Sequence, residues 1–432
     1  MTTTSTQPHP APLPDTDRLP VLDVSRGIAL LGILFVNASF FALPSMQAVE
    51  TIAPRNEGTL SHFLHAFIAI FCTGKFYPLF SILFGVGLCI MAHSAASAQR
   101  SFTAVWVRRM LMLAFFGLLH ITLFWSGDIL VLYAIVGASS FWLARCSVRT
   151  LIILAAIGFT IAAFLAGVFG ALSSTFAHQI ESSIANNPAT LDPSKSFFDN
   201  LSLVLSSDLS TLDPRFAQLE TSALRDGPFL HALVIRLIQY LWFLVIMIPV
   251  MGPQVFACFA LGCALLKSGF FHNRLPKLRR ALILAFLFIA LPAHTAAYFI
   301  SSSTSSGMLL SSLSMLITSI LGPLSCLAYL ALILRWLDQP RTPFFARSIA
   351  ALGRLGLTGY LGETILMSFF MLHWGLGWYA DTTYPSRAAL TLAVWLSLVI
   401  FANLYLKNFR IGPLEWLWRT TTYLKPPPLR KH

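Results

Sequence analysis

The sequence predicts an all-α protein that crosses a membrane many times, and three observations lead to this fold class. Of the 432 residues, 56% are hydrophobic and only 11% are charged, whereas soluble domains average about 25% charged residues. The mean hydropathy is +0.73. The apolar stretches are continuous and as long as helices, whereas a membrane β-barrel shows short alternating segments. This pattern excludes a soluble enzyme, a disordered chain and a disulfide scaffold.

Ten segments are apolar and long enough to span a bilayer, which takes about 20 helical residues. The predicted spans cover residues 26–44, 60–93, 104–126, 128–145, 150–173, 238–267, 281–300, 308–336, 351–375 and 387–407. The second span is long and carries Gly74, Lys75 and Pro78 in its middle. The sixth contains Pro249 and Pro253 and can consist of two helices, so an eleventh segment remains open.

The spans divide the chain into five parts. Residues 1–20 form a disordered tail rich in Thr, Pro and Asp, and residues 21–173 form an N-terminal five-helix membrane half. The polar insertion 174–228 is rich in Ser, Asn, Asp and Pro, and the C-terminal five-helix half, 229–410, follows it. Residues 411–432 form a tail whose aromatic and basic side chains suit an amphipathic helix on the cytoplasmic surface.

Basic residues predict which ends of the helices face the cytoplasm. The chain has a net charge of +12 and 29 Lys and Arg residues. With both termini inside, most of these residues fall in cytoplasmic segments, as the positive-inside rule requires. The insertion then lies outside and holds more acids than bases. The positive charge therefore reflects membrane topology, and the expected partner is the lipid bilayer and not a nucleic acid.

The cysteines and histidines do not form the pattern of a metal site. The six cysteines lie in or beside apolar segments without the spacing of metal ligands. His62 and His65 are one helical turn apart near the outer end of the second span, but no third ligand accompanies them. We therefore expect no metal.

Polar residues inside predicted spans are candidate functional residues, because a bilayer accommodates them only at a cost in free energy. Asn37 lies well inside the first span and shares a helix face with Arg26, about three turns earlier. Asp23 is placed to pair with Arg26. Lys75 and Glu363 both lie near the middle of the membrane by residue count. We expect these two residues to pair and to line a polar cavity.

A histidine and an acid around the loop between the third and fourth spans form the most specific candidate site. An acid that orients a histidine raises its basicity, so Asp128 and His120 suit general-base catalysis. Alternatively, Asp128 only caps the start of the fourth span. On the cytoplasmic side, Arg100, Arg108 and Arg109 are candidates for binding phosphate groups, and Arg26 and Arg354 are further candidates for binding a substrate or cofactor.

Six motifs occur in order over nearly the whole chain. They are LDVSRGIALLGILFVN at 22–37, GKFYPLFSILFGVG at 74–87, GLLH at 117–120 with GDILVLYA at 127–134, LGCALLKSGF at 261–270, GRLGLTGY at 353–360 and GPLEWLWR at 412–419. These motifs resemble those of the YeiB family of bacterial inner-membrane proteins, whose C-terminal domain has no known function. The resemblance implies a multi-pass protein of the bacterial inner membrane.

The opening motif is also distantly similar to the transmembrane acyltransferase superfamily. Its members take an acyl group from cytosolic acyl-CoA and deliver it to an acceptor on the far side, with a histidine as base or acyl carrier. This similarity implies acyl-CoA as donor and a small-molecule, glycan or lipid acceptor. His65 suits a second-span position and His120 suits the family motif, so both remain candidates. Asn37 or Lys75 would stabilise the oxyanion.

Two other functions remain open at this stage. In a transporter or permease for a small or lipid-like substrate, Lys75, Glu363 and the histidines would form a substrate or proton site. In a non-catalytic membrane scaffold, the same polar residues would only tie helices together. Neither the substrate nor the oligomeric state follows from the sequence.

Overall fold

The computed structural model describes residues 19–49, 58–97, 99, 101–186, 190–207, 213–272, 274–302, 308–339 and 344–431. Within these ranges the regular elements are helices, apart from one isolated bridge between Phe409 and Arg430. The all-α prediction is confirmed. The helices of the first half are α1 (Pro20–Ala42), α2 (Ser45–Val49), α3 (Gly58–Phe71), α4 (Phe76–Ser97), α5 (Phe102–Leu123), α6 (Leu130–Ser139) and α7 (Val148–Asn186).

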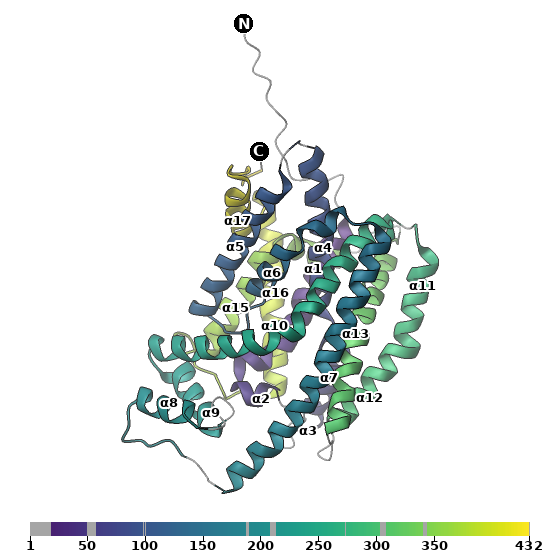
Figure 1. The fold of residues 1–432 in the computed structure, drawn as a ribbon. Helices are drawn as coiled ribbons and strands as arrows, with labels where there is room; N and C mark the ends of the chain where they lie inside the picture. Colours follow the sequence, from purple (N-terminus) through teal and green to yellow (C-terminus); the bar gives the residue numbers. More distant parts are fainter. Residues whose placement is uncertain are drawn as a thin grey trace.

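The insertion and the second half continue the bundle (Figure 1). Their helices are α8 (Phe197–Leu205), α9 (Pro214–Thr221), α10 (Phe229–Lys267), α11 (Pro276–Ala285), α12 (Leu291–Ser301), α13 (Met308–Leu337), α14 (Phe344–Arg354), α15 (Gly356–Met371), α16 (Tyr384–Asn408) and α17 (Pro413–Tyr423). Figure 1 places α17 at one end of the bundle and α8, α9 and α2 at the opposite end.

Eight stretches of the described chain are long and apolar enough to cross a membrane. They are Pro20–Ala42, Gly58–Ser97, Phe102–Leu123, Val148–Leu172, Ile248–His272, Pro276–Ser301, Ser312–Leu337 and Tyr384–Asn408. Two shorter helices, α6 and α15, stand where the fourth and ninth spans were predicted. The ninth span, 351–375, is wrong as a single helix, because the chain breaks at Leu355 between α14 and α15.

The second predicted span is a broken helix. Gly74 has a positive φ of 73°, which separates α3 from α4. The Lys75 ammonium group donates hydrogen bonds to the carbonyl oxygens of Ala69 (3.3 Å) and Thr73 (2.8 Å). These carbonyls would otherwise lack partners at the end of α3. Lys75 is fully buried, and its charge therefore satisfies the backbone where the helix breaks.

The sixth predicted span begins later than expected. Figure 1 shows the first part of α10 running across the bundle before the helix turns along it. The described stretch Ile248–His272 qualifies as a span, and Phe229–Val245, the first part of the same helix α10, is a shorter apolar stretch. The predicted start at residue 238 is therefore wrong. Pro249 and Pro253 both lie inside α10, where proline removes backbone hydrogen bonds and permits bending.

The bundle presents an apolar exterior. Large hydrophobic side chains are exposed along its outer helices, among them Leu111, Phe164, Phe288 and Ile400, each at least 60% exposed. In water such a surface would aggregate, whereas lipid tails cover it without loss. The fold is therefore that of a polytopic membrane protein in a lipid bilayer.

Helices α1 and α14 pack closely through two glycines. A Cβ atom at Gly353 would collide with the carbonyl oxygen of Asp23, and one at Gly27 would collide with the backbone of Ile349. Small residues allow backbones to approach in this way in membrane bundles. The contact fixes the start of α1, and therefore Arg26, beside α14 and Arg354.

The glycine contact gives a first prediction. Gly353→Ala should lower the free energy of unfolding by about 1–3 kcal/mol, because the added methyl group has no space. Gly87→Ala is the matched control, since a Cβ atom there would meet nothing within 4 Å. Thermal unfolding of both variants in detergent measures the difference. Equal melting temperatures for the two variants would contradict the packing argument.

Candidate functional site

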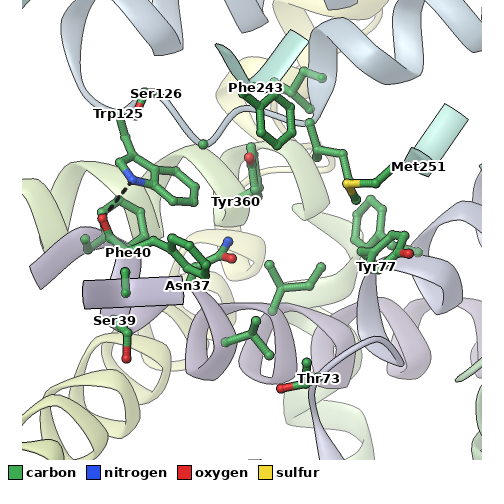
Figure 2. Close-up of a pocket in the computed structure, with 18 of the residues that line it drawn as sticks. Asn37, Ser39, Phe40, Thr73, Tyr77, Trp125, Ser126, Phe243, Met251 and Tyr360 are labelled. Carbon is green, nitrogen blue, oxygen red and sulfur yellow. Dashed lines mark hydrogen bonds between the residues drawn. The ribbon is translucent and has the colours of Figure 1, made fainter. Parts of the chain in front are cut away.

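A large cavity of about 1770 Å³ runs through the bundle. At one end it is lined by the arginines of the basic end, which are Arg26, Arg109, Arg354 and Arg419. At the other it is lined by Ser126, Glu220, Arg236 and Gln239, which form the insertion end. Figure 2 shows the middle, where Asn37 points into the cavity and Tyr77 and Met251 lie across from it. The cavity therefore connects two charged ends through a mainly apolar interior.

The basic end concentrates positive charge around Arg109. The Arg109 guanidinium stacks on the Trp418 ring at 3.8 Å, and Arg26 and Arg419 lie close enough to repel it. Arg26 is paired with an acid, since its Nη1 donates to Asp23 Oδ1 at 2.9 Å. The end thus carries a net positive charge that suits an anion.

The predicted arginines do not all reach this end. Arg100 lies outside the described residues. Arg354 lines the cavity and donates to the carbonyl oxygen of Arg410 at 3.3 Å. Arg108 instead donates from Nε to the carbonyl oxygen of Thr422 at 2.8 Å and does not line the cavity. The expectation that Arg108 binds substrate therefore finds no geometric support, because its neighbour Arg109 occupies the inward face of α5.

Glu415 attaches α17 to the start of α15. Its carboxylate accepts hydrogen bonds from the backbone N–H groups of Leu357 (2.7 Å) and Thr358 (2.9 Å) and from the Thr358 hydroxyl (2.6 Å). An acid at a helix N-terminus also complements the helix dipole. Burial raises the pKa of the Glu415 carboxyl, and these hydrogen bonds oppose that rise. The tail helix is thereby held over the basic end, with Trp418 on Arg109.

The insertion end holds a chain of hydrogen bonds centred on Glu220. Its carboxylate accepts from the Ser45 backbone and hydroxyl, from Gln239 Nε2 (2.6 Å) and from the Tyr379 hydroxyl (2.6 Å). Gln239 in turn accepts from the Ser126 hydroxyl at 2.8 Å. Burial raises the pKa of the Glu220 carboxyl, while the hydrogen bonds act in the opposite direction. The chain ties α2, α9 and α10 together around this end.

The predicted pair of His120 and Asp128 is present. The His120 Nδ1 atom lies 2.8 Å from Asp128 Oδ2, and both side chains are fully buried. Asp128 Oδ1 also accepts from the Val131 backbone N–H at 2.9 Å, so the capping role exists beside the orienting one. His120 Nε2 lies 2.9 Å from the Thr364 hydroxyl. An acid, a histidine and a hydroxyl thus form one chain, the arrangement that activates hydroxyl groups in enzymes.

His120 lies one layer behind the cavity wall. It does not line the cavity, but Tyr360 and Trp125 do, and their rings lie 5.3 Å and 6.1 Å from the imidazole between ring centroids. Figure 2 shows both rings at the cavity edge. A substrate in the cavity therefore reaches His120 only when one of these rings turns aside.

The expected pair of Lys75 and Glu363 is not formed. Lys75 is bound to the backbone at the break between α3 and α4, and no ion pair joins it to Glu363 in the described part of the chain. Glu363 is buried on α15, and its Oε1 has no hydrogen-bond partner among the described residues. Neither side chain lines the cavity. Residue counting placed them at one depth, but Lys75 lies at the break between α3 and α4 beside Cys326 of α13, whereas Glu363 lies on α15.

The remaining predicted residues fall into two groups. Asn37 and His65 line the cavity, and His65 Nδ1 lies 3.4 Å from the Tyr298 hydroxyl. His62 is exposed and donates to the Gly58 carbonyl oxygen. Over the ranges that the structure covers, no group of three His, Cys, Asp or Glu residues is placed to hold a metal ion.

The helices, the apolar exterior and the internal cavity define a polytopic helical membrane protein. Residues 265–425 match a family model described as "Protein of unknown function (DUF418)". The chain is 28% identical to the uncharacterized protein YxaH of Bacillus subtilis, over 96% of both chains. It is 27% identical to the uncharacterized protein YeiB of Escherichia coli, over 94% of this chain and 96% of YeiB. The chain is therefore similar over nearly its whole length to the YeiB protein, and its C-terminal part matches the DUF418 model; no solved structure matches it.

The sequence alone does not identify several residues of the site. Thr364 is one of many hydroxyl residues in apolar segments, and nothing in its spacing indicates a bond to His120. Glu220 and Arg236 lie in or beside the insertion, whose sequence carries no recognisable motif. Trp418 and Arg419 belong to the motif GPLEWLWR at 412–419, but only the folded tail brings them to the cavity.

The buried Glu220 predicts a pH dependence of stability. Because its pKa is higher in the folded state than the ordinary unfolded value of about 4.3, the folded protein binds this proton more tightly. Stability is then greatest below the unfolded pKa and falls as the pH rises through the folded pKa. Melting temperatures from pH 4.5 to 8 should therefore fall less in Glu220→Gln than in the wild type. Glu415 acts in the same direction, so the melting temperature of Glu220→Gln should still fall somewhat with pH. Identical pH profiles of the melting temperature in the variant and the wild type would contradict the prediction.

Proposed function

We propose that this membrane protein transfers an acyl group from cytosolic acyl-CoA to an acceptor on the other side of the bacterial inner membrane. The observation that carries the proposal is the continuous cavity, which joins the basic end to the insertion end and passes beside the His120–Asp128 pair. The basic end would face the cytoplasm, as the expected orientation requires. A cavity of about 1770 Å³ is large enough for an acyl-pantetheine arm.

The basic end supports the binding of the CoA phosphates. Arginine recognises phosphate through charge-assisted hydrogen bonds, and four arginines line this end. The acyl thioester would extend along the apolar middle past Tyr133 and Tyr77 towards Asn37. The Asn37 amide points into the cavity and is placed to donate a hydrogen bond to a thioester oxygen.

The chemical step assigned to His120 is general-base catalysis. The imidazole takes the proton of the acceptor hydroxyl or amine while the acceptor atom bonds to the thioester carbon. The carbon–sulfur bond then breaks, and the imidazolium returns the proton to the CoA thiolate. Asp128 holds the imidazole in one tautomer and stabilises its charged form. The step requires that Thr364 release Nε2 and that Tyr360 or Trp125 turn aside.

Binding of the donor is tested by thermal shift with acetyl-CoA. Acetyl-CoA should stabilise the wild-type protein in detergent, and Arg109→Gln should weaken this binding about tenfold or more, because it removes a charged phosphate contact. Arg108→Gln is the matched control, since this neighbouring side chain points away from the cavity. An equal loss in both variants, or no response in folded wild-type protein, would contradict the donor assignment.

Catalysis is tested by the release of free CoA thiol from acetyl-CoA in the presence of a bacterial envelope extract. His120→Ala should lower the rate by about 10²–10⁴-fold, the usual contribution of a general base. His62→Ala is the control, because His62 is exposed and lies outside the cavity lining. The folded fraction of each variant is measured by its melting transition. A folded His120→Ala protein with wild-type turnover would refute the role of His120.

Transport of a lipid-like anion is the second candidate function. One observation favours it: His120 is sealed from the cavity, whereas the cavity itself runs between both ends. Transport predicts flux of substrate without consumption of acyl-CoA, and His120→Ala would leave that flux unchanged. Proteoliposome flux beside the thiol-release assay separates the two functions.

A further inference from the structure

Arg236 is a buried cation at the insertion end of the cavity. It belongs to the part of α10 that crosses the bundle, and only 2% of its surface is exposed. Its Nη2 atom donates to the Thr122 carbonyl oxygen at 2.9 Å. Its Nε and Nη1 atoms are buried and have no hydrogen-bond partner among the residues that the structure describes. The side chain lines the cavity with donor capacity unused.

No acid neutralises this guanidinium within the described ranges. None of the ion pairs found there includes Arg236. Glu220 lines the same end, but its carboxylate is occupied by Ser45, Gln239 and Tyr379. The Phe229 ring, with its centroid 5.4 Å from the guanidinium carbon, supplies only a weak cation–π contact. A buried charge without a counter-charge is strongly unfavourable, so this guanidinium favours an anionic partner.

A second unused donor lines the same cavity from α15. The Ser368 hydroxyl is 1% exposed and has no partner among the described residues. The segment that follows α15 lies at the insertion end, because the hydroxyl of its Tyr379 donates to Glu220 at 2.6 Å. The His373 backbone is fixed by a 2.9 Å hydrogen bond to the Leu224 carbonyl oxygen. Two separate helices thus present donors without acceptors towards the insertion end.

We infer that Arg236 binds an anionic group of the acceptor, of the phosphate type, at the insertion end. This inference rests on the proposed function, because it names the class of molecule that receives the acyl group. An anion there would supply the missing counter-charge and accept hydrogen bonds from the guanidinium. A phosphate can come from a lipid headgroup or from a soluble phosphorylated molecule. The basic end and Arg236 then hold donor and acceptor at opposite ends of one cavity.

The first experiment measures phosphate binding by thermal shift on the full-length protein in uncharged detergent. Sodium phosphate should raise the melting temperature more than sodium chloride of equal ionic strength. Arg236→Gln should weaken the apparent phosphate affinity about 10- to 100-fold, the loss expected for a buried charged hydrogen bond. Arg225→Gln is the matched control, since this exposed arginine already pairs with Asp226 at 2.9 Å. Equal phosphate responses in wild type and Arg236→Gln overturn the inference.

Two further variants separate this site from the basic end. Arg109→Gln should keep the part of the phosphate response that depends on Arg236 and weaken the acetyl-CoA response, whereas Arg236→Gln should lose that part of the phosphate response and keep the acetyl-CoA response. A phosphate response that is lost in Arg109→Gln but kept in Arg236→Gln places the anion at the basic end and overturns the inference. Absence of any acetyl-CoA response in the wild type refutes the proposed donor but leaves the phosphate comparison intact. Arg236→Met, which removes the charge and leaves no polar group buried, provides a folded comparison if the glutamine variant unfolds, and undiminished phosphate affinity in it overturns the inference.

The source of the phosphate is tested in nanodiscs. If the ligand is a lipid headgroup, wild-type protein should be more stable in phosphatidylcholine discs that contain phosphatidylglycerol, and Arg236→Gln should lose this gain. If the ligand is soluble, glucose 6-phosphate should stabilise the wild type in pure phosphatidylcholine discs, again through Arg236. Failure of both probes to distinguish wild type from Arg236→Gln overturns the inference.

Discussion

The bond between the Lys75 ammonium and the end of α3 is the interaction on which the cavity depends. A helix that breaks inside a bilayer exposes carbonyl groups that lipid cannot satisfy. Lys75 satisfies two of them, and the Cys326 thiol donates to the Lys75 carbonyl oxygen at 2.6 Å. The break places Thr73 and Gly74 at the cavity wall and lets α4 begin with Tyr77 facing inward. Lys75, which the sequence indicates as a substrate ligand, therefore caps the C-terminal end of α3.

The two ends of the cavity differ in how their charges are balanced. At the basic end, several arginines converge and Glu415 is occupied by the N-terminus of α15, so positive charge remains for a ligand. At the insertion end, Glu220 is bonded to neutral partners, while no acid among the described residues pairs with Arg236. Both ends therefore favour anions, and the apolar middle separates them. This charge distribution suits two anionic ligands that meet inside the protein better than a simple pore for cations.

The position of His120 limits what the protein can do without motion. Its imidazole is bonded at both nitrogens and is screened from the cavity by Tyr360 and Trp125. The pair of His120 and Asp128 is protected from water until the ring of Tyr360 or Trp125 turns. The reaction would therefore take place only when substrate fills the cavity. The same burial also stabilises the contact between α5 and α15. Catalytic and structural roles thus share the same hydrogen bonds.

The sequence by itself determined the all-α membrane class, the resemblance to the YeiB protein, most of the spans and the pairing of His120 with Asp128, because apolar periodicity and short-range spacing are local properties. It also pointed to Arg26, Asn37 and Arg109, which the fold brings to one cavity. Tertiary structure alone decided that Lys75 and Glu363 stay apart, that Arg108 turns away, and that Thr364 and Arg236 belong to the site. These outcomes depend on helix rotation and packing between residues far apart in the chain, which residue counting cannot supply.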